Sequence, residues 1–268
     1  FDTNSNKFVV AYEDLGNSSY GTAIVGTVSG TSISFGSPVV FETSSSDQTS
    51  SAFDTNLNKV VIAYRDDGDN DYGKAVVGTV SGTSISFGTP VVFENSSILQ
   101  PSVSFDSTSN KIVIGYEHIA NLSYGTSVVG AVSGNSITFG TPVVFEESDS
   151  DSIAVTFDSS ANKTVIAYRD NGNSGYGTAI VGTVSGSSIS FTTPVVFESA
   201  NTNWNKATFD SVSNKVVLAY RDNDASGVGT SVVIETAPTN SENFIGITAE
   251  AISDTATGAV NVYGGINE

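Results

Sequence analysis

Apolar residues along this chain come in short runs separated by turn residues, and the same order of runs recurs five times. Each recurrence opens with Phe-Asp, has Asn-Lys after three intervening residues, and begins 52 residues after the previous one. The repeats start at Phe1, Phe53, Phe105, Phe157 and Phe209. Self-similarity at a fixed period of this size indicates a repeat architecture. No sustained 3.6-residue periodicity accompanies it, which disfavours helical repeats.

Within one repeat the sequence predicts four short β-strands. In the third repeat they cover residues 102–105, 111–116, 125–132 and 136–145. Valine and isoleucine occupy both alternating sets of positions in the second and third strands, as in residues 60–64. A strand that is apolar on both sides lies in a sheet covered on both faces.

The fold class that these strands predict is all-β, a five-bladed β-propeller of four-stranded blades. Stacking the blades radially lets each sheet pack on its neighbours. Asp and Asn in residues 54–58 and the glycine in residues 80–83 suit the tight turns between strands. A proline recurs in the fourth strand, which we expect at the outer edge of each blade, where a missing N–H is harmless. These prolines are Pro38, Pro90, Pro142 and Pro194.

The two ends of the chain depart from the repeat. The propeller accounts for residues 1–237, and residues 238–268 are interpreted as a linker plus a C-terminal β segment. Residues 243–252 and 259–266 predict a short hairpin extension. Its first arm either replaces the missing fourth strand of the fifth blade, since Phe244 falls one residue past the expected position, or begins a second, truncated domain. The chain opens within a repeat and without Met, so we expect a processed or excised piece of something longer.

Composition narrows the function classes. Acidic residues number 28 against 10 basic ones, and the net charge of −18 repels nucleic-acid phosphates and anionic lipid heads. This charge argues against a nucleic-acid partner. We also expect no membrane insertion, because no apolar run approaches the ~18 residues of a spanning helix. With no Cys and one His, disulfides, zinc thiolates and multi-histidine metal sites are excluded, and histidine-based catalysis is disfavoured.

The connections between strands vary unequally among the repeats. Those joining the first strand to the second and the third to the fourth barely change, whereas those on the opposite face vary. Binding residues concentrate on loops held by a rigid scaffold, so the variable face is the expected functional one, although drift in unconstrained loops would give the same pattern. The variable connections between blades cover residues 42–50, 94–101, 146–152 and 198–206.

All three arginines occupy one position on that face, directly after the tyrosine of the second strand. They are Arg65, Arg169 and Arg221, and Glu13 and Glu117 hold the position in the other two repeats. A planar guanidinium binds a carboxylate through two parallel hydrogen bonds. The arginines therefore contact either an acidic sugar or, in an ion-pair belt between blades, a neighbouring glutamate.

Aromatic residues on the same face are candidates for stacking on sugar rings. Tyr20, Tyr72, Tyr124 and Tyr176 each precede a glycine, and Trp204 lies between asparagines in a polar connection between blades. Packing against the neighbouring blade is the alternative for both kinds of residue.

One acidic loop offers oxygen ligands. Asp67, Asp69 and Asp71 alternate as at the start of a calcium-binding loop, but the acid at its twelfth position and the glycine at its sixth are absent. We expect no cofactor, with Ca²⁺ at this loop as the alternative. His118 stands where the other repeats have aspartate, and without a second histidine we expect an exposed loop residue.

The repeat resembles a known family. Its form is Phe-Asp-x-x-x-Asn-Lys-Val-Val-Ile-Ala-Tyr-Arg-Asp, then Tyr-Gly-Thr-Ala-Ile-Val-Gly-Thr-Val-Ser-Gly. Over about residues 1–236 it resembles the propeller-type repeats of tail-fibre and other structural proteins of marine bacteriophages and of secreted proteins of marine bacteria. The resemblance implies an extracellular or virion location and a receptor-binding or appendage role. Its partners would be cell-surface glycans or other appendage subunits, and no reaction is implied.

The leading hypothesis is therefore a non-enzymatic recognition or structural module, part of a phage fibre or surface appendage that binds host glycans. A sialidase-like propeller glycoside hydrolase is the competing class, but it needs arginines or paired carboxylates that converge at one centre. A third alternative is a self-assembling filament subunit. Unpaired strand edges recruit partners, so a homo-oligomer formed through the C-terminal segment is expected.

Overall fold

The computed structural model describes residues 1–236, 246–249 and 261–262, which form antiparallel β-strands and four short 3-10 helices. The strands are β1 (Phe8–Asp14), β2 (Tyr20–Ser29), β3 (Ser32–Phe35), β4 (Val39–Asp54), β5 (Lys59–Asp66), β6 (Tyr72–Ser81), β7 (Ser84–Phe87), β8 (Val91–Asp106), β9 (Lys111–His118), β10 (Tyr124–Ser133), β11 (Ser136–Phe139), β12 (Val143–Asp158), β13 (Lys163–Asp170), β14 (Tyr176–Ser185), β15 (Ser188–Phe191), β16 (Val195–Asp210), β17 (Lys215–Asp222), β18 (Val228–Glu235), β19 (Gly246–Ala249) and β20 (Asn261–Val262). The helices are η1 (Leu15–Asn17), η2 (Asp67–Asp69), η3 (Ile119–Asn121) and η4 (Asn171–Asn173).

The repeated Phe-Asp-x-x-x-Asn-Lys motif builds the turn between the first and second strands of each sheet. In the second repeat, the Asp54 carboxylate accepts hydrogen bonds from the backbone N–H groups of Asn56 and Leu57. Asn58 then takes the left-handed conformation, with φ of 54°, which asparagine tolerates better than most residues. Lys59 donates to the Thr79 hydroxyl at 2.7 Å and so ties the turn to the third strand.

Four long strands connect the sheets and belong to two sheets each. β4 pairs with β2 through its first half and with β5 through its second half, and β8, β12 and β16 behave alike. The variable connections between blades, expected as loops, are therefore continuous strands. This expectation was wrong because β-bulges and register shifts let each strand change sheets without leaving extended structure.

The fourth strand is interrupted in each of the first four sheets. In the second sheet, β7 and the start of β8 both pair with β6, and Pro90 lies in the gap between them. The recurrent prolines thus mark a break in the outer strand and do not lie inside it. A glycine opens the gap, since a side chain at Gly88 would collide with the backbone carbonyl of Asn135 in the next repeat.

Each sheet packs on the next through a separate apolar core, as the sequence pattern predicts. Val60, Ile62 and Tyr64 of β5 pack toward the first sheet, whereas Val61 and Ala63 pack toward the third. All five side chains are at most 3% exposed. Four such cores join the five sheets.

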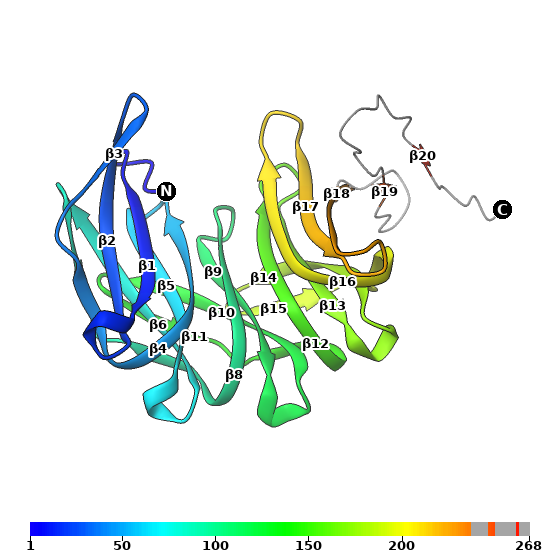
Figure 1. The fold of residues 1–268 in the computed structure, drawn as a ribbon, viewed down its shortest axis with the longest axis horizontal. Coiled ribbons are helices and arrows are strands. Elements are labelled where there is room, and N and C mark those ends of the chain that lie inside the picture. Colours follow the sequence, from blue (N-terminus) through cyan, green and yellow to red (C-terminus); the bar gives the residue numbers. More distant parts are fainter. Residues whose placement is uncertain (237–245, 250–260, 263–268) are drawn as a thin grey trace.

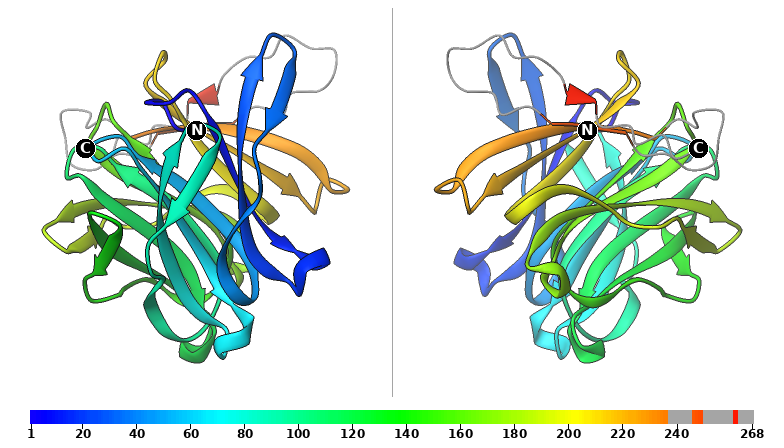
Figure 2. Two further views of the ribbon diagram at one scale, coloured as in Figure 1. Left: turned by 90° about the vertical axis from the view of Figure 1, so that its left-hand side faces the viewer. Right: turned by 90° about the vertical axis from the view of Figure 1, so that its right-hand side faces the viewer.

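The five sheets follow an arc from β1 and β2 to β17 and β18 (Figure 1), and Figure 2 views the molecule from the two ends of that arc. β1 and β18 do not pair with each other among the described residues, so closure into a five-bladed propeller is not observed there. β19 pairs with β18, the third strand of the fifth sheet, and so lies where the other sheets have their fourth strand. β20 pairs with β19. Phe244 and the remainder of the predicted hairpin lie outside the described residues.

Candidate binding groove on the long strands

The β-bulges of the long strands line up across four sheets. Each interrupts pairing with the following strand, for example between Asp47 and Ser50 of β4 and between Asn203 and Lys206 of β16. One residue in each bulge has a positive φ, between 49° and 61°. These residues are Gln48, Gln100, Ser152 and Trp204, at the repeat spacing of 52.

Hydrogen bonds link these bulge residues from one sheet to the next. The side-chain oxygen of Gln48 accepts from the backbone N–H of Gln100, and the Gln100 side chain accepts from the N–H of Ser152. The Ser152 hydroxyl in turn accepts from the N–H of Trp204 at 3.1 Å. Trp204 is in β16, the last of the four long strands, so the series of bonds ends there.

A groove of about 520 Å³ runs over these bulges, and Trp204 is its largest side chain. Trp204 is 70% exposed, unlike the aromatic residues of the cores, so it does not serve to pack one sheet on another. Lys206 provides a positive charge within the same groove. The other lining residues are Gln48, Thr49, Ser50, Leu99, Gln100, Pro101, Ser102, Ser152, Ile153, Asn203 and Asn205.

Asn205 is a buried polar residue of the groove whose side chain has no partner. It is 1% exposed, and neither its Oδ1 nor its Nδ2 atom makes a hydrogen bond among the described residues. At this position the earlier repeats carry apolar Ile153 and Pro101 and, in the first, Thr49. Buried amides almost always bind a hydrogen-bonding group, so Asn205 is suited to contact a polar ligand or a water held between ligand and protein.

The arginines neither reach this groove nor converge. Arg65 lies 2.7 Å from Asp67 and 3.1 Å from Asp71 of its own repeat, and Arg169 lies 3.1 Å from Asp151. Arg221 is exposed. The expected ion pairs of the arginines with Glu13 and Glu117 were therefore wrong. Arg65 and Arg169 pair instead with aspartates of the adjoining turn and long strand, which lie closer to them.

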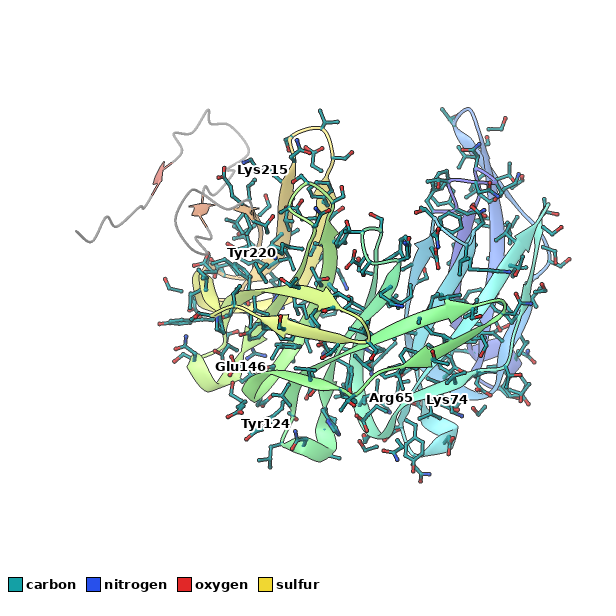
Figure 3. All side chains as sticks on the ribbon, turned by 180° about the vertical axis from the view of Figure 1, so that it is seen from behind. Arg65, Lys74, Tyr124, Glu146, Lys215 and Tyr220 are labelled. Atoms are coloured by element: carbon teal, nitrogen blue, oxygen red, sulfur yellow. The ribbon has the colours of Figure 1, made fainter. Side chains whose placement is uncertain are left out.

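Two cations, Arg65 and Lys74, pair with the aspartates of the acidic loop in the second repeat (Figure 3). Arg65 binds Asp67 and Asp71, while Lys74 lies 2.9 Å from Asp69 and 2.5 Å from Asp66. Within the described residues no group of three or more acidic or histidine side chains is arranged to hold a metal ion. The sequence held a signal for this pairing that the calcium-loop expectation overlooked: Lys74 stands where the other repeats have threonine.

The candidate tyrosines do not share the groove with Trp204. Tyr20, Tyr72, Tyr124 and Tyr176 begin the third strand of their sheets, are half-buried, and do not line the groove. Of the sequence candidates, the groove contains only Trp204.

His118 is half-buried rather than exposed. Its Nε2 atom lies 2.7 Å from the Ser96 hydroxyl, which also donates to Glu94 at 2.9 Å beside a cavity of about 680 Å³. The second and fourth repeats have a serine–aspartate hydrogen bond at the same place, as between Ser148 and Asp170 at 2.8 Å. His118 therefore replaces a structural aspartate, and its contact with Ser96 has a structural counterpart elsewhere in the chain.

Tyrosine–glutamate hydrogen bonds between sheets were missed by sequence reasoning. The hydroxyl of Tyr168 donates to Glu146 of the preceding sheet at 2.9 Å, and Tyr220 donates to Glu198 at 2.8 Å. Burial and the adjacent carboxylate raise the pKa of the Tyr168 hydroxyl, which stays protonated and keeps donating. The signal was available, since the tyrosine follows the glutamate by 22 residues each time. The other two pairs are Tyr64 with Glu42 and Tyr116 with Glu94.

Compared with known proteins, the chain matches no family model and no curated sequence. Among the residues described, no helix is long and apolar enough to cross a membrane.

Proposed function

We propose that this protein is a non-enzymatic recognition module of an extracellular appendage or virion, with a propeller-like arrangement of blades and a carbohydrate-binding groove at Trp204. The single observation that carries the proposal is the exposed indole in a groove that also contains an unpartnered buried amide. Sugar rings present C–H faces that stack on indole and hydroxyl groups that bind amides.

The surroundings of Trp204 support a ligand role over a packing role. The bulge position holds a hydrogen-bond acceptor in the three preceding repeats, and the acceptor joins one sheet to the next. Trp204, in the last long strand, is 70% exposed, so most of its apolar surface is free to be buried by a ligand. The neighbouring Asn203, Asn205 and Lys206 supply polar groups in the same groove.

The context supports a surface appendage. The chain has few charged residues, a net charge of −18 and no cysteine, and its repeats resemble those of phage structural proteins. Arg65 and Arg169 bind nearby aspartates of the turn and the long strand, which favours a binding module over a sialidase-like hydrolase with converging arginines. Host-cell glycans are therefore the proposed ligands, and other appendage subunits are further partners.

A glycan array followed by calorimetry tests this proposal. Trp204→Ala should weaken binding of the retained glycan at least 10-fold, with little change in melting temperature, because the side chain packs on no core. Leu122→Ala is a matched control, since Leu122 is 73% exposed and also has a positive φ, but lies outside the groove. Equal glycan binding by wild type and Trp204→Ala would contradict the proposal, as would the absence of any retained glycan.

A second variant examines the buried amide. Asn205→Ile copies the residue of the preceding repeat and removes the unpartnered polar group, so it should raise stability by about 1 kcal/mol. The same change should weaken glycan binding if the amide contacts the ligand. Urea unfolding and calorimetry on one preparation separate the two effects, and unchanged glycan affinity would exclude Asn205 from the site.

A further inference from the structure

The first and fifth sheets expose opposite halves of the interface that joins successive sheets within the chain. Every internal interface pairs the leading face of one sheet with the trailing face of the sheet before it. We define the leading face by Val60, Ile62 and Ile85 of the second sheet, and the trailing face by Val165, Ala167 and Val181 of the fourth. The first sheet has its leading face at one end of the arc, and the fifth has its trailing face at the other.

The leading face of the first sheet is apolar and exposed. Phe8, Val10 and Ile33 are 39%, 44% and 47% exposed, whereas the residues one repeat later, Val60, Ile62 and Ile85, are at most 3% exposed. The hydroxyl of Tyr12 on this face has no partner among the described residues, although the tyrosine at this position bonds to the preceding sheet in the four other repeats.

The trailing face of the fifth sheet has the matching composition. Ala219 is exposed and Val217 and Val233 are half-buried. One repeat earlier, Ala167 and Val165 are fully buried and Val181 is 6% exposed. The small and β-branched residues that receive the leading face inside the chain therefore recur at this end.

We propose that the first sheet of one copy docks on the fifth sheet of a second copy, head to tail, with the packing that joins successive sheets inside the chain. The argument for a second copy is that one chain carries both halves of an interface already formed four times within it. Such a contact is heterologous, so it extends into a ring or a filament. It goes beyond the proposed glycan binding and does not depend on it.

Sedimentation of three variants tests the contact. Val10→Glu damages only the leading face and Ala219→Glu only the trailing face, and Val212→Glu, at a 91% exposed turn position, is the matched control. Wild type and Val212→Glu should associate as concentration rises through the micromolar range. Association should strengthen with salt, because each copy carries a net charge of −18. Each face variant alone should associate about 100-fold more weakly, since docking would bury an unpaired carboxylate.

Mixing the two face variants is the decisive measurement. Each retains one intact face, so an equimolar mixture should form a dimer and nothing larger. The proposal is overturned if wild type stays monomeric throughout the range, or if the mixture does. It is also overturned if Val10→Glu dissociates the assembly while Ala219→Glu does not, because that result indicates contact between two leading faces.

Discussion

Glu117 links the stability of this protein to pH. It occupies the position held by arginine in three repeats, yet its side chain is buried, with 6% of the residue exposed. Burial raises the pKa of its carboxyl from 4.5 to about 7, the Asp151 and Asp149 carboxylates add to this, and a hydrogen bond from Ser123 opposes it. The perturbation we propose is Glu117→Gln, which keeps the shape and removes the titration.

The magnitude follows from the two pKa values. Between pH 4.5 and about 7 the folded protein holds a proton on Glu117 that the unfolded chain has released. The folded state then binds more protons, so the free energy of unfolding falls as pH rises, and the loss is complete above about pH 7. A difference of about 2.5 pKa units corresponds to about 3 kcal/mol as an upper limit, at about 1.4 kcal/mol per unit.

Urea unfolding of wild type and Glu117→Gln at several pH values between 4 and 8 measures this effect. The variant should match wild type near pH 4 and become more stable by up to about 3 kcal/mol at pH 8. Glu147→Gln, at an exposed position of β12, controls for the loss of one negative charge from an acidic chain. If the difference between wild type and Glu117→Gln stays constant across the pH range, burial does not penalise this carboxylate and the reasoning fails.

Two further predictions concern the repeated contacts. Asp106→Ala removes the acceptor of hydrogen bonds from the N–H groups of Thr108 and Ser109 and should lower stability by about 1–2 kcal/mol without affecting glycan binding, as thermal unfolding and calorimetry would show. Tyr168→Phe leaves the Glu146 carboxylate without its donor and should cost about 1–3 kcal/mol in urea unfolding. The same change at Tyr12 should cost much less, and equal costs would show that the hydrogen bond between sheets contributes nothing.

Local chemistry made much of the fold predictable. The Asp and Asn of the repeated motif specify a turn whatever surrounds it, since Asp54 binds the turn's own N–H groups and Asn58 adopts a positive φ. Apolar residues on both sides of β5 required sheets on both faces, and the cores confirm this. The expectation of loops between the sheets failed because polar residues at 42–50 suggest a loop, whereas a bulged strand holds the same residues in extended structure.

The sequence by itself determined the repeat, the strands, the turns and the packing of sheets on one another through both faces, because these depend on the order of residues within 52 positions. Only the tertiary structure decided which side chains meet across sheets. Trp204 shares a groove with Gln48 because four bulges align, and Arg65 binds Asp67 because the turn brings it closer than Glu13. Such contacts depend on the angle between successive sheets, which arises from the packing of whole faces and from no single residue pattern.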